Sequence, residues 1–183
     1  MRLERRTVPR STILLDNDRK RGTLGKKAAK TNAMRMLDAA GIPHEVREYE
    51  VDETDLSGMH VAAQLGQDPD QVFKTLVLEN QAHEHLVCCI PSSCELDLKK
   101  VARASCSKKV EMIPMKTLLP TTGYIRGGCS PIGMKKPFPT FIDETAQLHD
   151  RIAISAGMRG AQIIIEPDTL CDFVNATYAD LTV

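Results

Sequence analysis

The succession of short apolar runs is the feature that most constrains the fold of this 183-residue chain. Runs typical of strands occur at residues 42–51, 72–80, 84–91, 108–112, 138–143, 151–157 and 161–167. Segments with helical period lie at 30–41, 58–66, 94–105 and 114–119, and a helix starting at Pro167 is expected to close the domain. Because strands and helices do not alternate regularly, we expect an α/β domain with a mixed, barrel-like sheet of about seven short strands and flanking helices. A doubly wound sheet is not expected.

Residue spacing assigns faces to several of these segments. The first helix has four apolar residues on one side, which we expect to be buried: Ala33, Met36, Leu37 and Ala40. The runs at 72–80 and 84–91 predict a β-hairpin. Within its second strand, Cys88 and Cys89 point to opposite faces and are interpreted as small buried hydrophobic residues.

Charge divides the chain into two parts. Lys plus Arg and Asp plus Glu are both 24, yet residues 1–30 contain ten basic and three acidic side chains. We therefore expect residues 1–29 to form a basic, mobile extension and residues 30–183 to form the folded domain. No window approaches the ~18 apolar residues that a membrane span needs, so a cytoplasmic protein without membrane contact is expected.

The six cysteines do not form a recognisable metal or redox motif. No Cys-x-x-Cys occurs, and a chain of this size can build a core without disulfides. His83 and His85 lie near a turn without further ligands at suitable spacing, so we expect solvated histidines, no metal and no cofactor. A thiol-based redox or metal protein remains the rival hypothesis, to be decided by thiol titration and metal analysis.

Lys74 stands in a strongly apolar strand. Side chains alternate along a strand, so Lys74 shares one face with Val72, Leu76 and Leu78. Burying an ammonium costs several kcal/mol unless it is paired, and a lysine in this place usually has an anionic or polar partner. The alternative is a strand-end lysine whose ammonium reaches water.

The segment "TTGYIRGGCSPIGMKK", residues 121–136, combines four glycines with basic residues. It has neither a dinucleotide-binding spacing nor a P-loop. Gly127 and Gly128 allow backbone N–H groups to approach a carbonyl or phosphate oxygen, while Pro131 and Gly133 would fix a tight loop around Ser130. A glycine bulge at a sheet corner is the structural alternative.

Taken together, five stretches in this order resemble the YbaK/EbsC family of freestanding editing proteins, and in particular its Cys-tRNA(Pro) deacylases: "FKTLVL", "LDLKKVA", "KKVEM", "TGYIRGGCSPIGMKK" and "ISAGMRG". The family also includes the editing insertion of bacterial prolyl-tRNA synthetase. The likeness extends from Lys30 to Val183. It implies a barrel-like mixed sheet and a pocket for the aminoacyl-adenosine end of a tRNA.

The resemblance also implies which residues form the site. The essential lysine of the family falls on Lys74, and the other implied substrate-binding positions are Tyr49, Thr75, Gly127, Gly128, Ser130, Pro131, Gly133, Ser155 and Gly157. Two positions depart from the family pattern. Ser57 replaces an aromatic residue before Gly58, and Gln162 replaces an acidic residue, which leaves the fine specificity open.

The function implied by the resemblance is cleavage of the ester of mischarged Cys-tRNA(Pro), and also of Cys-tRNA(Cys). The substrate thiol would attack its own carbonyl and expel the tRNA, so no protein nucleophile is needed. Cys129 has no activating His or acid beside it on the chain and is not expected to be a nucleophile. Two alternatives stay open: a deacylase for Ala-tRNA(Pro) or another small aminoacyl-tRNA, and a non-catalytic module that binds tRNA or a synthetase.

The neutral composition suggests that selection of the tRNA depends on a partner, for which prolyl-tRNA synthetase is the natural candidate. Contacts to the tRNA body would rest on surface lysines, with an ordinary solvated face as the alternative: Lys99, Lys100, Lys108, Lys109, Lys135 and Lys136.

Overall fold

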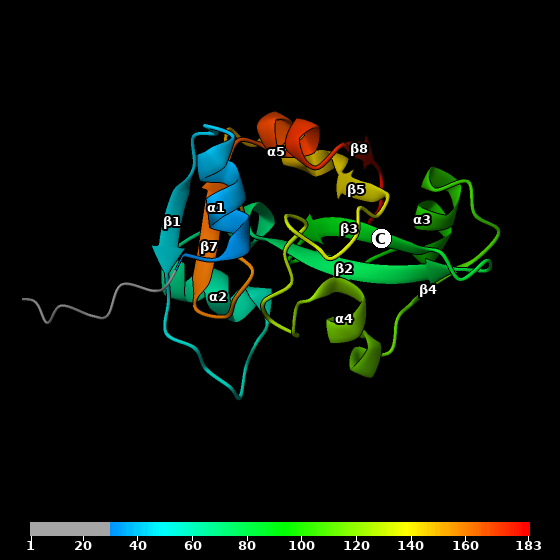
Figure 1. Ribbon diagram of the computed structural model, residues 1–183, viewed down its shortest axis with the longest axis horizontal. Coiled ribbons are helices and arrows are strands. Elements are labelled where there is room, and N and C mark those ends of the chain that lie inside the picture. Colours follow the sequence, from blue (N-terminus) through cyan, green and yellow to red (C-terminus); the bar gives the residue numbers. More distant parts are fainter. Residues whose placement is uncertain (1–29) are drawn as a thin grey trace, which may run out of the picture.

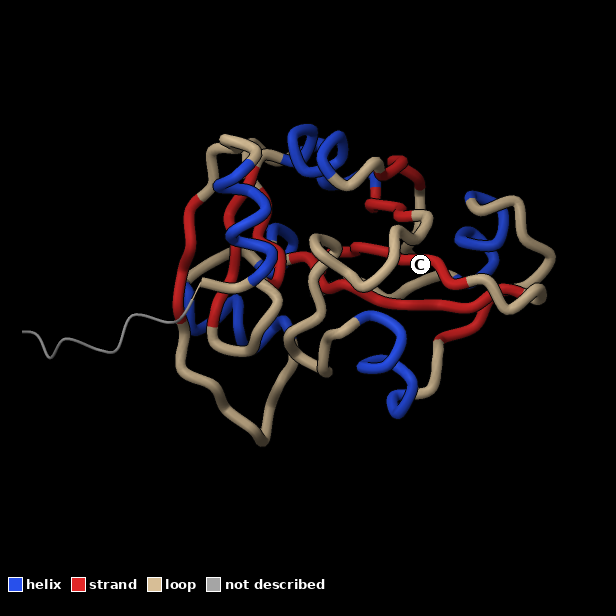
Figure 2. Tube along the Cα trace, in the orientation of Figure 1, coloured by secondary structure: helices blue, strands red, loops and turns tan. Residues whose placement is uncertain are grey.

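The computed structural model describes residues 30–183 as a mixed α/β domain (Figures 1 and 2). The expected extension, residues 1–29, lies outside the described residues. The helices are α1 (Asn32–Ala39), α2 (Gly58–Leu65), α3 (Leu98–Ala104), α4 (Met115–Thr122) and α5 (Pro167–Phe173), with 3₁₀ turns at Pro69–Gln71 and Glu144–Leu148. The strands are β1 (Glu45–Glu48), β2 (Phe73–Asn80), β3 (His85–Pro91), β4 (Val110–Met112), β5 (Thr140–Asp143), β6 (Ile152–Ser155), β7 (Ala161–Ile165) and β8 (Ala176–Ala179).

The strands form two sheets instead of the expected barrel. The smaller sheet has the order β1-β7-β6, and the larger has the order β4-β2-β3-β5-β8. A single parallel bridge between Val72 and Ala153 joins the start of β2 to β6, so the sheets touch at one end without closing on themselves (Figure 1). The mixed α/β class is therefore confirmed, and the barrel is not.

The expected hairpin of β2 and β3 is the centre of the larger sheet. The two strands are antiparallel, from Phe73 opposite Pro91 to Glu79 opposite His85. Side chains on one face, including Phe73 and Val77, join a core with α1, β6 and β7, whereas Leu78 joins a second core beneath α3. Cys89 belongs to the first core and Cys88 to the second, which confirms their opposite orientation.

The buried face of the first helix differs from the expected one. In α1 the buried residues are Ala33, Met34 and Leu37, while Met36 is 39% exposed and Ala40 is exposed. The Thr31 side chain accepts from the Met34 amide at the start of this helix and donates to the Ala156 carbonyl, which ties the helix start to the segment after β6.

The chain also continues past its last helix. After α5 and a left-handed Asn175, residues 176–179 form β8, which pairs in parallel with β5. This strand is short and partly polar, so its sequence lacks the apolar alternation that marks the other strands.

The two histidines, both expected to be solvated, differ from each other. His83 is exposed in the hairpin turn, but His85 is the first residue of β3 and packs edge-on against Phe138, with ring centroids 5.8 Å apart.

Candidate functional site

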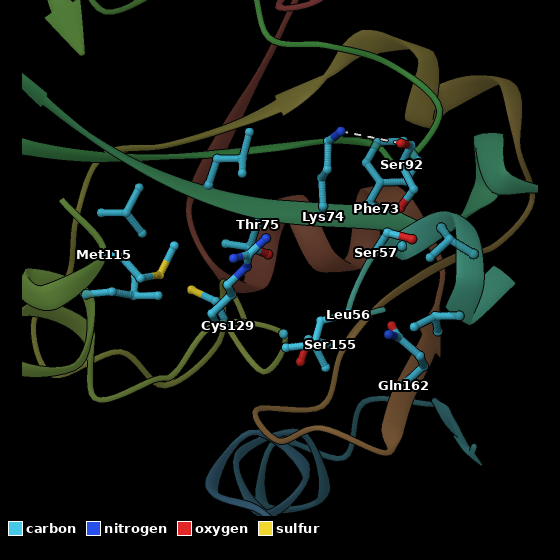
Figure 3. A pocket seen from close by; sticks show the side chains of 18 of the residues that line it. Leu56, Ser57, Phe73, Lys74, Thr75, Ser92, Met115, Cys129, Ser155 and Gln162 are labelled. Atoms are coloured by element: carbon cyan, nitrogen blue, oxygen red, sulfur yellow. Dashed lines mark hydrogen bonds between the residues drawn. The ribbon is translucent and has the colours of Figure 1, made fainter. Parts of the chain in front are cut away.

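A cavity of about 500 Å³ opens beside the point where the two sheets meet. Its wall is built by the start of β2, the segment before α2, the β4–α4 connection, the glycine segment and the ends of β6 and β7 (Figure 3). Among the residues implied by the family, the structure brings five to this wall: Tyr49, Lys74, Thr75, Gly127 and Ser155.

The Lys74 ammonium is held by backbone carbonyls. Its Nζ donates to the carbonyl of Cys94 at 2.6 Å and to that of Ser92 at 3.3 Å. Both carbonyls belong to the segment that follows β3, which β2 and β3 bring alongside because they pair directly. An ammonium has three N–H donors, so two bonds leave one donor for a ligand. Lys74 therefore has a polar partner, and its side chain is partly buried.

Lys74 and the glycine segment lie at different parts of the wall. In Figure 3 the Lys74 side chain points from β2 toward Ser92, whereas Thr75 points the other way, toward Cys129. This follows from the alternation of side chains along β2. A ligand that contacts both the ammonium and the glycine segment must therefore extend across the edge of β2.

The two adjacent glycines have different roles. Gly127 lines the cavity with φ of 81°, and its N–H donates to no described backbone carbonyl. The Gly128 amide, by contrast, donates to the Ile125 carbonyl at 3.0 Å. A Cβ on Gly128 would lie 3.1 Å from the Met158 Cα, so this glycine permits close packing of two backbone segments. The expectation that the Gly128 amide faces a ligand is therefore not met.

The remaining implied residues of the glycine loop do not line the cavity and pack behind its wall. Ser130 is fully buried, and its Oγ accepts from the Ile132 amide. A Cβ on Gly157 would lie 3.0 Å from the Tyr124 ring. The Tyr124 hydroxyl in turn donates to the Ile132 carbonyl. Five of the implied binding residues are thus outside the cavity wall: Gly128, Ser130, Pro131, Gly133 and Gly157.

Several wall residues were not singled out as binding residues from the sequence. They are mostly apolar residues from β4, α4 and the connecting segments, together with one serine and one arginine: Leu56, Ser92, Met112, Ile113, Met115, Leu118 and Arg126. No sequence signal marks Ser92, because its position depends on tertiary packing against Gly58, where a Cβ would lie 2.0 Å from the Ser92 Oγ. The two positions that depart from the family pattern, Ser57 and Gln162, also line the cavity.

Two buried polar atoms of the wall lack a hydrogen-bond partner among residues 30–183. They are the Ser92 Oγ and the Gln162 Oε1. Buried polar atoms are nearly always paired in folded proteins, so unpaired atoms in a cavity are typical of a site that completes its bonds with a ligand or water.

The cavity wall offers no side chain that would act as a base near neutral pH. It contains no Asp, Glu or His. Burial raises the pKa of the Cys129 thiol from 9.0 to about 12, with the neighbouring Cys89 as a second cause. Cys129 therefore remains a neutral thiol, and Lys74 and Arg126 are the charged residues of the wall.

Residues 30–183 contain no cluster of three or more His, Cys, Asp or Glu residues placed to hold a metal ion. All six cysteines in this range are free, and Cys106 is the exposed one. None of the described helices has the length and apolar character needed to cross a membrane.

Comparison with known proteins identifies the family to which this chain belongs. The model of the aminoacyl-tRNA editing domain matches residues 58–173. A protein of Enterococcus faecalis (strain ATCC 700802 / V583), provisionally named Cys-tRNA(Pro)/Cys-tRNA(Cys) deacylase EbsC, is 48% identical over 157 residues. These residues cover 86% of this chain and 96% of the relative.

Solved structures share the fold at lower identity. The crystal structure of a protein provisionally described as a trans-editing enzyme for prolyl-tRNA synthetase matches with a TM-score of 0.73 and 21% identity, over 85% of this chain and 99% of that chain. The hypothetical protein APE2540 matches with a TM-score of 0.75 and 19% identity, over 81% and 97%. The structural matches support the fold, and the family model together with the Enterococcus relative shows that this chain belongs to the aminoacyl-tRNA editing domain family.

Proposed function

We propose that this protein is a freestanding deacylase that removes cysteine from mischarged Cys-tRNA(Pro), and also acts on Cys-tRNA(Cys). The observation that carries the proposal is the chemistry of the cavity wall, which has no carboxylate, no imidazole and no readily ionised thiol. Such a site is poorly equipped to activate water. It suits a substrate that brings its own nucleophile, and cysteine does so.

The reaction then needs only the substrate and the wall. The thiolate of the cysteinyl group attacks its own carbonyl carbon, a C–S bond forms, and the ester C–O bond breaks. The 3′-terminal ribose oxygen leaves and takes up a proton, and the thiolactone is opened by water to give free cysteine. The protein contributes position and electrostatic stabilisation, which are sufficient for an activated ester.

Each wall group has a role in this scheme. Lys74, fixed by the carbonyls of Ser92 and Cys94, uses its remaining N–H to hold the ribose or phosphate of the terminal nucleotide. The Gly127 amide meets the carbonyl oxygen as negative charge develops there. Gly128 supports this position through its bond to Ile125 and is not itself a donor to the substrate. Tyr49, Thr75 and Ser155 complete the binding surface.

We also propose that prolyl-tRNA synthetase is the partner that presents the tRNA. The folded domain has few features that could distinguish one tRNA from another, since its cavity accepts only the terminal part of the substrate. A partner that already holds tRNA(Pro) would supply the missing selectivity.

The experiment that tests the reaction compares substrates that differ at the nucleophile. Cys-tRNA(Pro) is expected to be cleaved at least about a hundredfold faster than Ser-tRNA(Pro), Ala-tRNA(Pro) or S-methylcysteinyl-tRNA(Pro), because intramolecular attack carries a large advantage. Initial rates of ester cleavage measure this. Equal rates on the alanyl substrate would replace the proposal with a general small-residue deacylase.

Variants of two wall residues complete the test. Lys74→Ala should lose activity about a hundredfold or more, and Lys74→Arg should recover part of it because the charge returns with a different shape. Cys129→Ala should keep activity within about threefold, since a thiol with so high a pKa is not the nucleophile. If Cys129→Ala were inactive while folded, a covalent mechanism would have to replace the one proposed.

A further inference from the structure

The two sides of the cavity mouth carry opposite charge. One side is the segment between β1 and α2, in which residues 50–55 contain four acidic residues and no basic one. The other side is α4 with the segments before and after it. Residues 112–142 contain four basic side chains and no acidic one. Figure 1 shows this loop and α4 along the same edge of the molecule.

The folded domain as a whole has the opposite charge. Residues 31–183 contain 14 basic and 21 acidic residues, so the domain as a whole has a net charge of −7. A polyanion would be repelled by most of its surface. Residues 98–110 are also basic, with five basic side chains and no acidic one, but none of these five lines the cavity. Residues 112–142 are the stretch along which a polyanion can lie next to the cavity.

The same region exposes large apolar side chains. Met112 is 46% exposed, Met115 57%, Leu119 51% and Ile125 46%. Met112 and Met115 also line the cavity, so the apolar surface continues from the interior of the site to its outside. We call this region the α4 surface, made of Met112, Met115, Lys116, Leu119, Ile125, Arg126, Lys135 and Lys136.

The basic side chains of the α4 surface are available for a ligand. Lys116, Arg126 and Lys136 are exposed, and no ion pair joins any of them to a described carboxylate. Lys135 bonds to the Pro120 carbonyl, which keeps its ammonium at the end of α4. Lys100 and Lys109, by contrast, are paired with Asp180 and Glu111 on other parts of the domain.

From these observations we propose that the α4 surface binds the single-stranded 3′ end of the RNA, with the terminal nucleotide in the cavity and the preceding nucleotides across α4. Exposed apolar side chains beside basic ones suit a single strand, because the faces of unstacked bases pack against the former and phosphates contact the latter. This proposal rests on the proposed function for the identity of the RNA, but not on the chemistry of cleavage.

Binding of an uncharged RNA tests the proposal without any reaction. The probe is a five-nucleotide RNA ending in CCA with a 5′ fluorescein, titrated with the full-length protein and followed by anisotropy at several salt concentrations. Lys116→Ala/Arg126→Ala should weaken binding about tenfold and reduce the salt slope by about one to two. Met115→Ala should weaken binding severalfold and leave the salt slope unchanged.

A matched control removes the same charge elsewhere. Arg103→Ala/Lys108→Ala takes two exposed cations, neither of them in an ion pair with a described carboxylate, from α3 and from the segment before β4. Binding should stay within about twofold of the wild type. Equal weakening by both double variants would overturn the proposal, because binding would then depend on total charge.

Two further outcomes are decisive. If the α4 variants bind the RNA normally but no longer bind purified prolyl-tRNA synthetase, the α4 surface is a protein interface and the proposal is wrong. If the wild type binds the RNA through α4 but does not cleave Cys-tRNA(Pro), the proposed function fails while the RNA surface stands.

Discussion

Because of three buried thiols, the free energy of unfolding is expected to fall as pH rises in the alkaline range. Burial raises the pKa of Cys89 and of Cys129 from 9.0 to about 12, and it raises the pKa of Cys88 further. The folded protein therefore favours the neutral thiols, and the unfolded chain ionises first as pH rises. The stabilisation is fully present below pH 9 and is lost between pH 9 and about 12, by about 1.4 kcal/mol per pH unit for each thiol.

Urea denaturation between pH 7.5 and 10.5 measures this effect, and the midpoint should fall steadily above pH 9. Cys106→Ser should leave the pH profile unchanged, because this thiol is exposed. Cys129→Ala should reduce the fall of the urea midpoint with rising pH, because one buried thiol is removed. A midpoint that stays constant to pH 10.5 would contradict the assignment of these thiols to a dry core.

Lys74 and Gly128 show how far single residues of the site could be predicted. Strand alternation was enough to single out Lys74, since an ammonium on an apolar face requires a partner. The partners themselves, the carbonyls of Ser92 and Cys94, could not be predicted because they depend on the path of the chain after β3. Gly127 and Gly128 look alike in the sequence, and their roles are separated by the bond of the Gly128 amide to Ile125 and by the backbone contact of Gly128 with Met158.

Among the elements, β5 and the C-terminal segment depend on Asp143. This carboxylate is buried; its Oδ1 accepts from the Thr145 amide and its Oδ2 from the Leu181 amide at 3.0 Å. Asp143→Ala would leave the Leu181 N–H buried without an acceptor, at a cost of about 2–3 kcal/mol. The melting temperature should fall by about 5–10 °C. The matched variant Asp150→Ala, at an exposed carboxylate, should change it by less than about 2 °C. An equal effect of the two variants would show that the Asp143 bonds contribute little.

Elements with a strong local signal were predicted well, and those that depend on distant partners were not. The β2–β3 hairpin, α2 and the strands β6 and β7 have clear apolar periods and turn residues at their ends. β8 has no such period, because its stability comes from pairing with β5 across the domain. The buried face of α1 likewise depends on residues far along the chain, because Ala33, Met34 and Leu37 pack in a core with β6 and β7. The two sheets are joined by a single bridge at Val72 and do not close into a barrel, which sequence patterns do not reveal.

At the scale of the whole molecule, charge is distributed so that the two sequence regions complement each other. Residues 1–30 have a net charge of +7 and residues 31–183 a net charge of −7. We expect removal of residues 1–29 to weaken tRNA binding and to reduce its salt dependence, since basic side chains near RNA release counterions. Cleavage of a small cysteinyl-adenosine ester should stay within about twofold, because the cavity is built from residues 49–162. Parallel assays on the tRNA and the small ester measure both effects, and an equal loss on both substrates would contradict this division.

The last residues of the chain lie beside the segment that holds Lys74. The Val183 amide donates to the Glu95 carbonyl, and Thr182 forms a bridge with Leu96. Cys94, which holds the ammonium, is the residue before Glu95. A purification tag or fusion partner appended after Val183 would therefore disturb the stretch of backbone whose carbonyl holds the Lys74 ammonium, so a tag is better placed before the first residue.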